Sequence, residues 1–212
     1  MDYSVLLIAA GKRAGEGQSY EKALASFDDS KSVLGQTISI FLNDEKCKQI
    51  VIVTSPADMR KVVQTNGSGK IVYVKGGVTR QESVLIGLTA ISEDVVLIHD
   101  GVRPWVKQSL INKLMARMDV EKACVLAIRP RGTMHRVVDG YIVESVDTTE
   151  YMVTQTPQAF QTSFIIDCYR KALRDGVHYN DDAAVVAAVS DQPIAVEKGD
   201  IRNARFILKQ EK

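Results

Sequence analysis

The chain has 212 residues, of which 45% are hydrophobic and 25% charged, and a formal net charge of +1. This composition is that of a globular protein, and the small net charge excludes a general affinity for nucleic acid or for an anionic membrane. No apolar stretch approaches the ~20 residues of a membrane span, and no basic and apolar leader opens the sequence. The three cysteines, Cys47, Cys124 and Cys168, lack metal-ligand spacing, so we expect free thiols and a cytoplasmic location.

The first motif joins an apolar run to a glycine-rich stretch. The run, residues 5–10, predicts a strand that is buried on both faces, as in parallel sheets. It gives way to small residues, namely Ala9, Ala10, Gly11, Gly15 and Gly17, interspersed with the cations Lys12, Arg13 and Lys22. Bare backbone can present N–H groups to an anion, so this stretch predicts a nucleoside triphosphate loop. A simple glycine-rich turn would give the same local signal, and neither the P-loop nor the dinucleotide fingerprint is present.

Apolar runs then alternate with segments of helical spacing. Strands are predicted over 50–54, 71–74, 95–98, 124–128 and 194–196, and helices over 33–42, 84–91 and 110–118, from about 162, and over 183–189. This alternation predicts one α/β domain over residues 1–212, with a mostly parallel sheet and right-handed crossovers. Ligands are expected at the carboxyl ends of its strands.

Two of these strand ends carry candidate binding residues. Asp100 follows the strand at 95–98 and could hold a cation or accept a hydroxyl, although a turn aspartate is the alternative. His99, next to it, is expected to be structural. After the strand at 71–74, Gly76 and Gly77 would let a base or ribose lie against the backbone, and Ser83 could either reach the base or cap the next helix.

The second half of the chain contains a predicted arm. Residues from about 131 to 147 read as a β-hairpin with a turn at Asp139–Gly140, and a protruding hairpin often packs against a second copy of itself. Residues 155–158 are expected to form a polar loop before the helix at 162. Near the end, Asn180 is expected to cap a helix whose first turn holds Asp181 and Asp182, an acidic pair that could also bind metal.

Several stretches, taken together and in order, resemble one family. They are AAG at 9–11 with EK at 21–22, GGVTRQESVLIGL at 76–88, VLIHDGVRP at 96–104, VDTTEYMVTQTPQAF at 146–160, the acidic pair and GDIRNAR at 199–205. The chain is therefore similar to the 2-C-methyl-D-erythritol 4-phosphate cytidylyltransferases. The resemblance implies a Rossmann-like fold of the nucleotidyltransferase type with a protruding β-hairpin arm, a homodimer joined through that arm, and a divalent cation, usually Mg²⁺.

The resemblance also implies an activity and a set of roles. The activity is transfer of CMP from CTP to 2-C-methyl-D-erythritol 4-phosphate with release of pyrophosphate, in non-mevalonate isoprenoid biosynthesis. Two alternatives stay open: another polyol phosphate such as ribitol 5-phosphate as acceptor, or a non-catalytic nucleotide-binding relative. The implied roles are catalysis for Lys22, Arg13 and Arg205, nucleotide binding for Ala9, Ala10, Gly11, Gly15, Gly76, Gly77, Ser83 and Asp100, acceptor binding for Arg103, Thr133, Thr148 and Asp181, and metal binding for Asp100.

The chain departs from the family pattern at four of these positions. Arg13 and Gly15 have exchanged the residue types of the family loop, so either Arg13 supplies the catalytic charge from a shifted loop or no residue does. Thr148 stands where an acceptor-binding arginine is expected, which removes a bidentate partner for the acceptor phosphate. Arg205 stands in place of a lysine and keeps the charge with a different geometry.

Overall fold

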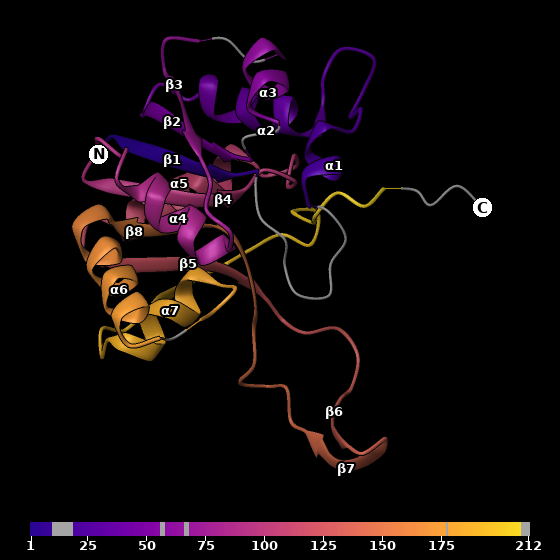
Figure 1. Ribbon diagram of the computed structural model, residues 1–212. Coiled ribbons are helices and arrows are strands. Elements are labelled where there is room, and N and C mark those ends of the chain that lie inside the picture. The colour runs from indigo at the N-terminus through magenta and orange to yellow at the C-terminus, as the bar shows by residue number, and fades with distance from the viewer. Residues whose placement is uncertain (10–18, 56–57, 66–67, 177, 209–212) are drawn as a thin grey trace.

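The computed structural model describes residues 1–9, 19–55, 58–65, 68–176 and 178–208. A seven-stranded sheet forms the centre of the molecule, with strand order β3-β2-β1-β4-β8-β5-β9 (Figure 1). Its strands are β1 Tyr3–Ile8, β2 Cys47–Thr54, β3 Ile71–Lys75, β4 Val95–Asp100, β5 Ala123–Ile128, β8 Val153–Gln161 and β9 Ala195–Lys198. All of the neighbouring pairs are parallel except those of β8, which is antiparallel to both β4 and β5. The prediction of a mostly parallel α/β sheet is confirmed.

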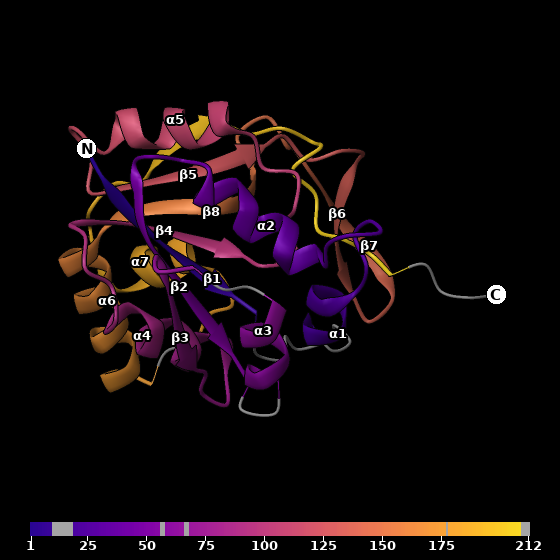
Figure 2. The same ribbon diagram turned by 90° about the horizontal axis from the view of Figure 1, so that it is seen from above.

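Helices cover both faces of the sheet (Figure 2). They are α1 Ser19–Leu24, α2 Val33–Leu42, α3 Met59–Thr65, α4 Arg80–Leu88, α5 Gln108–Arg117, α6 Thr162–Arg174 and α7 Asp182–Val189. One core lies between the sheet and α2, α3 and α5, and a second lies between the sheet and α4, α6 and α7. Alternate residues of β1 enter the two cores, with Leu7 in the first and Leu6 in the second. This double burial is why the first strand has an unbroken apolar sequence.

The expectation of a loop at residues 155–158 is wrong, because these residues lie within β8. The strand is buried despite its polar sequence because its side chains find partners in the interior; Gln158, for example, is fully buried. The pairing with β5 shifts register between Val125 and Leu126, whose partners are Gln158 and Gln155. Pro157 lies in this irregularity, where its missing N–H interrupts no ladder hydrogen bond.

The predicted hairpin is confirmed as an arm of two strands, β6 Met134–Val138 and β7 Tyr141–Val146, that projects from the sheet (Figure 1). Asp139 and Gly140 have φ values of 49° and 85°, the two positive angles that a tight hairpin turn requires. None of the helices in the described part of the chain combines the length and the apolar character that a bilayer crossing requires.

Candidate active site at the carboxyl end of β4

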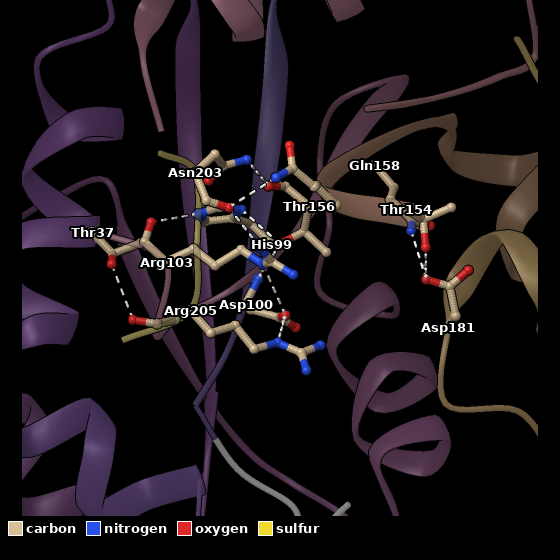
Figure 3. Close-up of polar contacts among 12 residues, drawn as sticks. Thr37, His99, Asp100, Arg103, Thr154, Thr156, Gln158, Asp181, Asn203 and Arg205 are labelled. Atoms are coloured by element: carbon tan, nitrogen blue, oxygen red, sulfur yellow. Dashed lines mark hydrogen bonds and ion pairs between the residues drawn. The ribbon is translucent and has the colours of Figure 1, made fainter. Parts of the chain in front are cut away.

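Asp100 is the last residue of β4 and lies near three arginines, of which Figure 3 shows Arg103 and Arg205. Its Oδ2 atom accepts hydrogen bonds from the Nε atoms of Arg103, at 3.3 Å, and Arg205, at 3.0 Å. Its Oδ1 atom lies 4.0 Å from Nη2 of Arg80. The side chains of Arg80 and Arg103 are 3% and 10% exposed, whereas that of Arg205 is 31% exposed. Arg205 is therefore the guanidinium of this cluster that faces solvent most openly.

The backbone around Asp100 is held by a buried chain of hydrogen bonds. The Asp100 N–H donates to Oγ1 of Thr156 at 3.0 Å, and Thr156 Oγ1 lies 3.0 Å from Nδ1 of His99. Nε2 of His99 lies 3.2 Å from the Arg103 carbonyl, which can only accept, so Nε2 carries the proton and Nδ1 accepts from the threonine hydroxyl. His99 thus links the positions of Asp100 and Arg103, and its predicted structural role is confirmed.

The environment of His99 favours the neutral imidazole. The pKa of His99 is lowered from 6.5 to about 4, chiefly because burial disfavours the charged ring; the Arg103 guanidinium acts in the same direction and Asp100 in the opposite one. A neutral ring is also what the hydrogen-bond chain requires, because Nδ1 needs a free lone pair to accept a hydrogen bond from the Thr156 hydroxyl. This residue therefore acts through geometry rather than through proton transfer.

The segment after β9 brings Arg205 to the cluster. Asn203 is fully buried; its Nδ2 donates to the Thr156 carbonyl at 2.8 Å, and its own carbonyl accepts from Nη1 of Arg103 at 2.7 Å. Gln155 Nε2 donates to the Asp200 carbonyl at 2.9 Å. These contacts fix the chain two residues before Arg205. Asn203, Gln155 and Thr156 were not predicted as site residues, because these partners lie 45 to 57 residues apart in the sequence.

Arg80 connects Asp100 with a second buried carboxylate, that of Asp182. Its Nη1 and Nη2 atoms bind both carboxylate oxygens of Asp182, at 2.9 and 2.7 Å, and the Tyr169 hydroxyl also donates to Asp182. Burial by itself would lower the pKa of Arg80, but Asp182 raises it well above its ordinary value, so the guanidinium stays charged. Among the described residues, three guanidiniums face the two carboxylates of Asp100 and Asp182, so this part of the cluster has a net charge of +1, which favours an anion. Sequence reasoning missed Arg80, and Asp182 is engaged in this buried ion pair.

Asp181 is the helix cap, one residue beyond the expected Asn180. Its carboxylate accepts from the N–H of Ala184 at 3.2 Å, from Gln158 Nε2 at 2.8 Å and from Thr154 Oγ1 at 3.2 Å (Figure 3). The contact with the Ala184 N–H shows that Asp181 caps the N-terminus of α7. Thr154, Gln158 and Asp181 lie in a group separate from the arginine cluster in Figure 3.

The turn after β3, which contains Gly76 and Gly77, is held by contacts with the first turn of α4. The N–H of Gly77 donates to Oγ of Ser83 at 3.1 Å, and a Cβ atom on Gly77 would lie 2.6 Å from that of Glu82. The cap of α4 is Thr79, which forms a capping box with Glu82. Ser83 is therefore no helix cap; it is buried and holds the glycine turn in place.

The remaining predicted residues divide between the first loop and the arm. Ala9 directly follows β1, is buried, and donates from its N–H to the Val53 carbonyl at 2.9 Å. Lys22 lies on α1 and is partly buried. Thr133 and Thr148 lie at the two ends of the arm, just before β6 and just after β7. Ala10, Gly11, Arg13 and Gly15 lie outside the described residues.

Comparisons with known proteins agree over nearly the whole chain. A family model described as IspD, 2-C-methyl-D-erythritol 4-phosphate cytidylyltransferase, matches residues 3–210. The protein of that name from Halalkalibacterium halodurans is 32% identical over 215 residues, covering 97% of this chain and 92% of the relative. The one from Geobacillus kaustophilus is 30% identical over 211 residues, with the same coverage.

Solved structures give the same result for the fold. The 4-diphosphocytidyl-2C-methyl-D-erythritol synthase of Anaerococcus prevotii superimposes with a TM-score of 0.86 at 25% identity, covering 98% of this chain and 91% of that one. The 2-C-methyl-D-erythritol 4-phosphate cytidylyltransferase of Thermus thermophilus gives a TM-score of 0.81 at 25% identity, with 99% and 94% covered.

Proposed function

Because the chain belongs to the 2-C-methyl-D-erythritol 4-phosphate cytidylyltransferase family, we propose that it transfers CMP from CTP to 2-C-methyl-D-erythritol 4-phosphate and releases pyrophosphate. This is a step of non-mevalonate isoprenoid biosynthesis. The cytoplasm is the proposed location, and the three cysteines, which are unpaired and buried, are compatible with a reducing compartment.

The observation that carries the proposal is the arginine cluster at the carboxyl end of β4. It lies at the end of the sheet where ligands of α/β proteins bind, and it presents excess positive charge with a solvent-facing guanidinium, Arg205. The turn at Gly76–Gly77 lies at the same end of the sheet, since it follows β3 directly and the N–H of Gly76 bonds the last residue of β2, Thr54. A charged cluster for phosphates and a bare backbone turn for a nucleoside are the two parts that a nucleotide site needs.

The chemistry requires positioning and charge stabilisation rather than a protein nucleophile. A phosphate oxygen of the acceptor attacks the α-phosphorus of CTP, a new P–O bond forms, and the bond to the bridging oxygen breaks with release of pyrophosphate. Negative charge on the phosphoryl oxygens and on the leaving pyrophosphate must be held by cations in line with the reacting groups. We assign this role to Lys22 and Arg205, with Arg13 as a third candidate.

Of the predicted acceptor residues, Thr133, Thr148 and Asp181 keep an acceptor role in the proposal, whereas Arg103 is assigned a supporting one. Arg103 contributes by holding Asp100 and the segment that carries Arg205. Thr133 and Thr148 lie on the arm, so a role for them at the cluster requires the arm of a second copy.

A homodimer is therefore the proposed assembly, and the composition of the arm supports it. Tyr141, Ile142 and Val137 are 76%, 63% and 56% exposed, and an isolated two-stranded hairpin is marginally stable in water. Apolar side chains on a projecting hairpin of this kind are stabilised when they pack against a partner.

Mg²⁺ is proposed as a companion of the nucleotide. Within the described residues no three His, Cys, Asp or Glu side chains come together as a metal-binding group. Asp100 offers one carboxylate, whose Oδ2 already accepts from two guanidiniums. Mg²⁺ is commonly bound by one or two carboxylates together with substrate phosphates, so this single acid fits an ion that is held mainly by the triphosphate. When bound, such an ion would neutralise charge on the phosphate oxygens.

Pyrophosphate release tests the proposal. The protein is incubated with CTP, Mg²⁺ and either 2-C-methyl-D-erythritol 4-phosphate or ribitol 5-phosphate, and we expect turnover with the first acceptor. Turnover with ribitol 5-phosphate alone would reassign the acceptor, and CTP binding without turnover for either acceptor would indicate a non-catalytic relative.

Arg205→Ala should lower kcat/KM by about 100-fold or more, the usual scale for loss of one charge-stabilising group. Arg202→Ala is the matched control, since Arg202 lies on the same segment, pairs with Asp200 and is 72% exposed.

A further inference from the structure

Three aromatic rings form a row beside the proposed site. The ring of Trp105 lies 5.9 Å from that of Phe27 and 6.1 Å from that of Phe206, measured between centroids. The Phe206 contact is stacked, at 27° between ring planes, and the Phe27 contact is tilted, at 55°. Trp105 is 40% exposed and is the sole tryptophan of the chain. We name Phe27, Trp105 and Phe206 the aromatic row.

At one end, the row reaches the segment that carries Lys22. Lys22 is five residues before Phe27, on α1, which has six residues. A helix this short is not stable by itself, so its position depends on packing. Phe27 lies three residues after α1. Its N–H donates to the Lys31 carbonyl at 2.8 Å and Asp28 accepts from the N–H groups of Ser30 and Lys31, while the N–H of Val33 donates to the Ala25 carbonyl at 2.9 Å, so the chain is held in place directly after α1.

At the other end, the row reaches the segment that carries Arg205. Residues 204–208 form no helix or strand, and Figure 1 shows this C-terminal segment passing beside α1. Phe206 directly follows Arg205, and its N–H donates to the Val102 carbonyl at 2.7 Å. This hydrogen bond and the stack on Trp105 hold the chain immediately after the arginine.

We infer that Trp105 is a positioning residue that sets the placement of Lys22 relative to Arg205. Its ring contacts both segments, neither of which has enough regular structure to fix its own place. Trp105 itself follows Arg103 and Pro104 in the loop after β4, so the row is anchored to the strand that carries Asp100. This inference rests on the proposed function, in which the two cations hold charge on the same phosphoryl group and must keep a set separation.

Steady-state kinetics of Trp105 variants test the inference. We expect the loss of each ring contact to lower kcat/KM by a few-fold to about ten-fold. Trp105→Ala removes both contacts and should therefore lower kcat/KM roughly 10- to 100-fold, mainly through kcat. Trp105→Phe keeps an aromatic ring and should stay within about three-fold of the wild type. Trp105→Leu, which keeps bulk without the ring, serves if the alanine variant does not fold. Tyr179→Ala is the matched control, because Tyr179 is 41% exposed and lies outside the row.

A double-mutant comparison separates positioning from packing. In a background that already lacks both cations, Lys22→Ala with Arg205→Ala, the effect of Trp105→Ala on the residual rate should shrink to about three-fold or less. The same fold-loss in both backgrounds would overturn the inference, since a residue that only stabilises the fold acts independently of the cations.

Tryptophan fluorescence tests the row without any turnover. Phe206→Ala and Phe27→Ala should each increase quenching of Trp105 by acrylamide, and unchanged quenching in both variants would overturn the inference. If the wild-type protein shows no turnover, the proposed function fails, and the inference is then judged by calorimetric titration with CTP. Trp105→Ala should weaken CTP binding several-fold; an unchanged affinity would overturn it.

Discussion

The pH dependence of stability is expected to depend strongly on His99. In the unfolded chain this imidazole takes up a proton as the pH falls through its ordinary pKa of 6.5, whereas in the folded protein it does so only near pH 4. Between these values the unfolded state binds more protons, so the stability contributed by the neutral ring is complete above pH 6.5 and is lost as the pH falls toward 4. One pKa unit corresponds to about 1.4 kcal/mol, so the loss amounts to about 3 kcal/mol.

The perturbation that isolates this effect is His99→Gln. A glutamine can accept from Thr156 and donate to the Arg103 carbonyl, as the neutral histidine does, but it does not titrate. Urea unfolding at intervals from pH 7 to pH 4 should therefore show the wild type losing about 3 kcal/mol more than the variant, whatever their difference at pH 7. Carboxylates titrate over part of this range, but they do so in both proteins. Parallel stability curves for the two proteins would refute the reasoning.

Three further predictions concern the buried ion pair of Asp182, the glycine turn at Gly77 and the exposed arm. Asp182→Asn should destabilise the fold by about 3–5 kcal/mol in urea unfolding, because the buried Arg80 loses its counter-charge; a loss below 1 kcal/mol would show that another group compensates. Gly77→Ala should cost about 1–3 kcal/mol and weaken CTP binding in calorimetry, because the new methyl group would lie 2.6 Å from Cβ of Glu82; wild-type affinity would argue against a nucleoside at this turn. Ile142→Asp, at the exposed tip of the arm, should convert the proposed dimer to a monomer in sedimentation velocity, and a monomeric wild type would contradict the assembly itself.

Much of the sheet could be predicted from the sequence because its strands are buried on both faces. Residues 5–8, 50–53 and 95–98 are continuous apolar runs because helices pack on both sides of them. The turn of the arm could be predicted for a different reason: Asp139 and Gly140 adopt positive φ angles, which few residue pairs tolerate. In both cases the structural requirement, burial on both faces or a positive φ angle, restricts the residue types at the same positions, so it is visible in the local sequence.

The antiparallel strand β8 could not be found in this way, because what stabilises it is distant. Gln158 is buried only because its amide donates to Asp181 and accepts from the N–H of Ala183, which lie 23 and 25 residues later. Thr156 is buried because it lies between the His99 ring and the Asp100 N–H. A polar residue whose partner is far along the chain looks the same in sequence as one in a solvated loop, so the sequence predicts a loop for residues 155–158.

Burial, which depends on distant partners, also distinguishes the three arginines that meet Asp100. The resemblance implies a catalytic role for Arg205 and an acceptor-binding role for Arg103, and it implies none for Arg80. Burial separates them: Arg80 and Arg103 are almost fully enclosed and hold Asp182, Asp100 and the Asn203 carbonyl, so moving either toward a substrate would strand a buried charge. Arg205 binds Asp100 through Nε with 31% of its side chain exposed. In the proposed reaction, a shift of Arg205 toward a phosphate would leave Asp100 paired with Arg103, so Arg205 can supply the positive charge that we assign to this position.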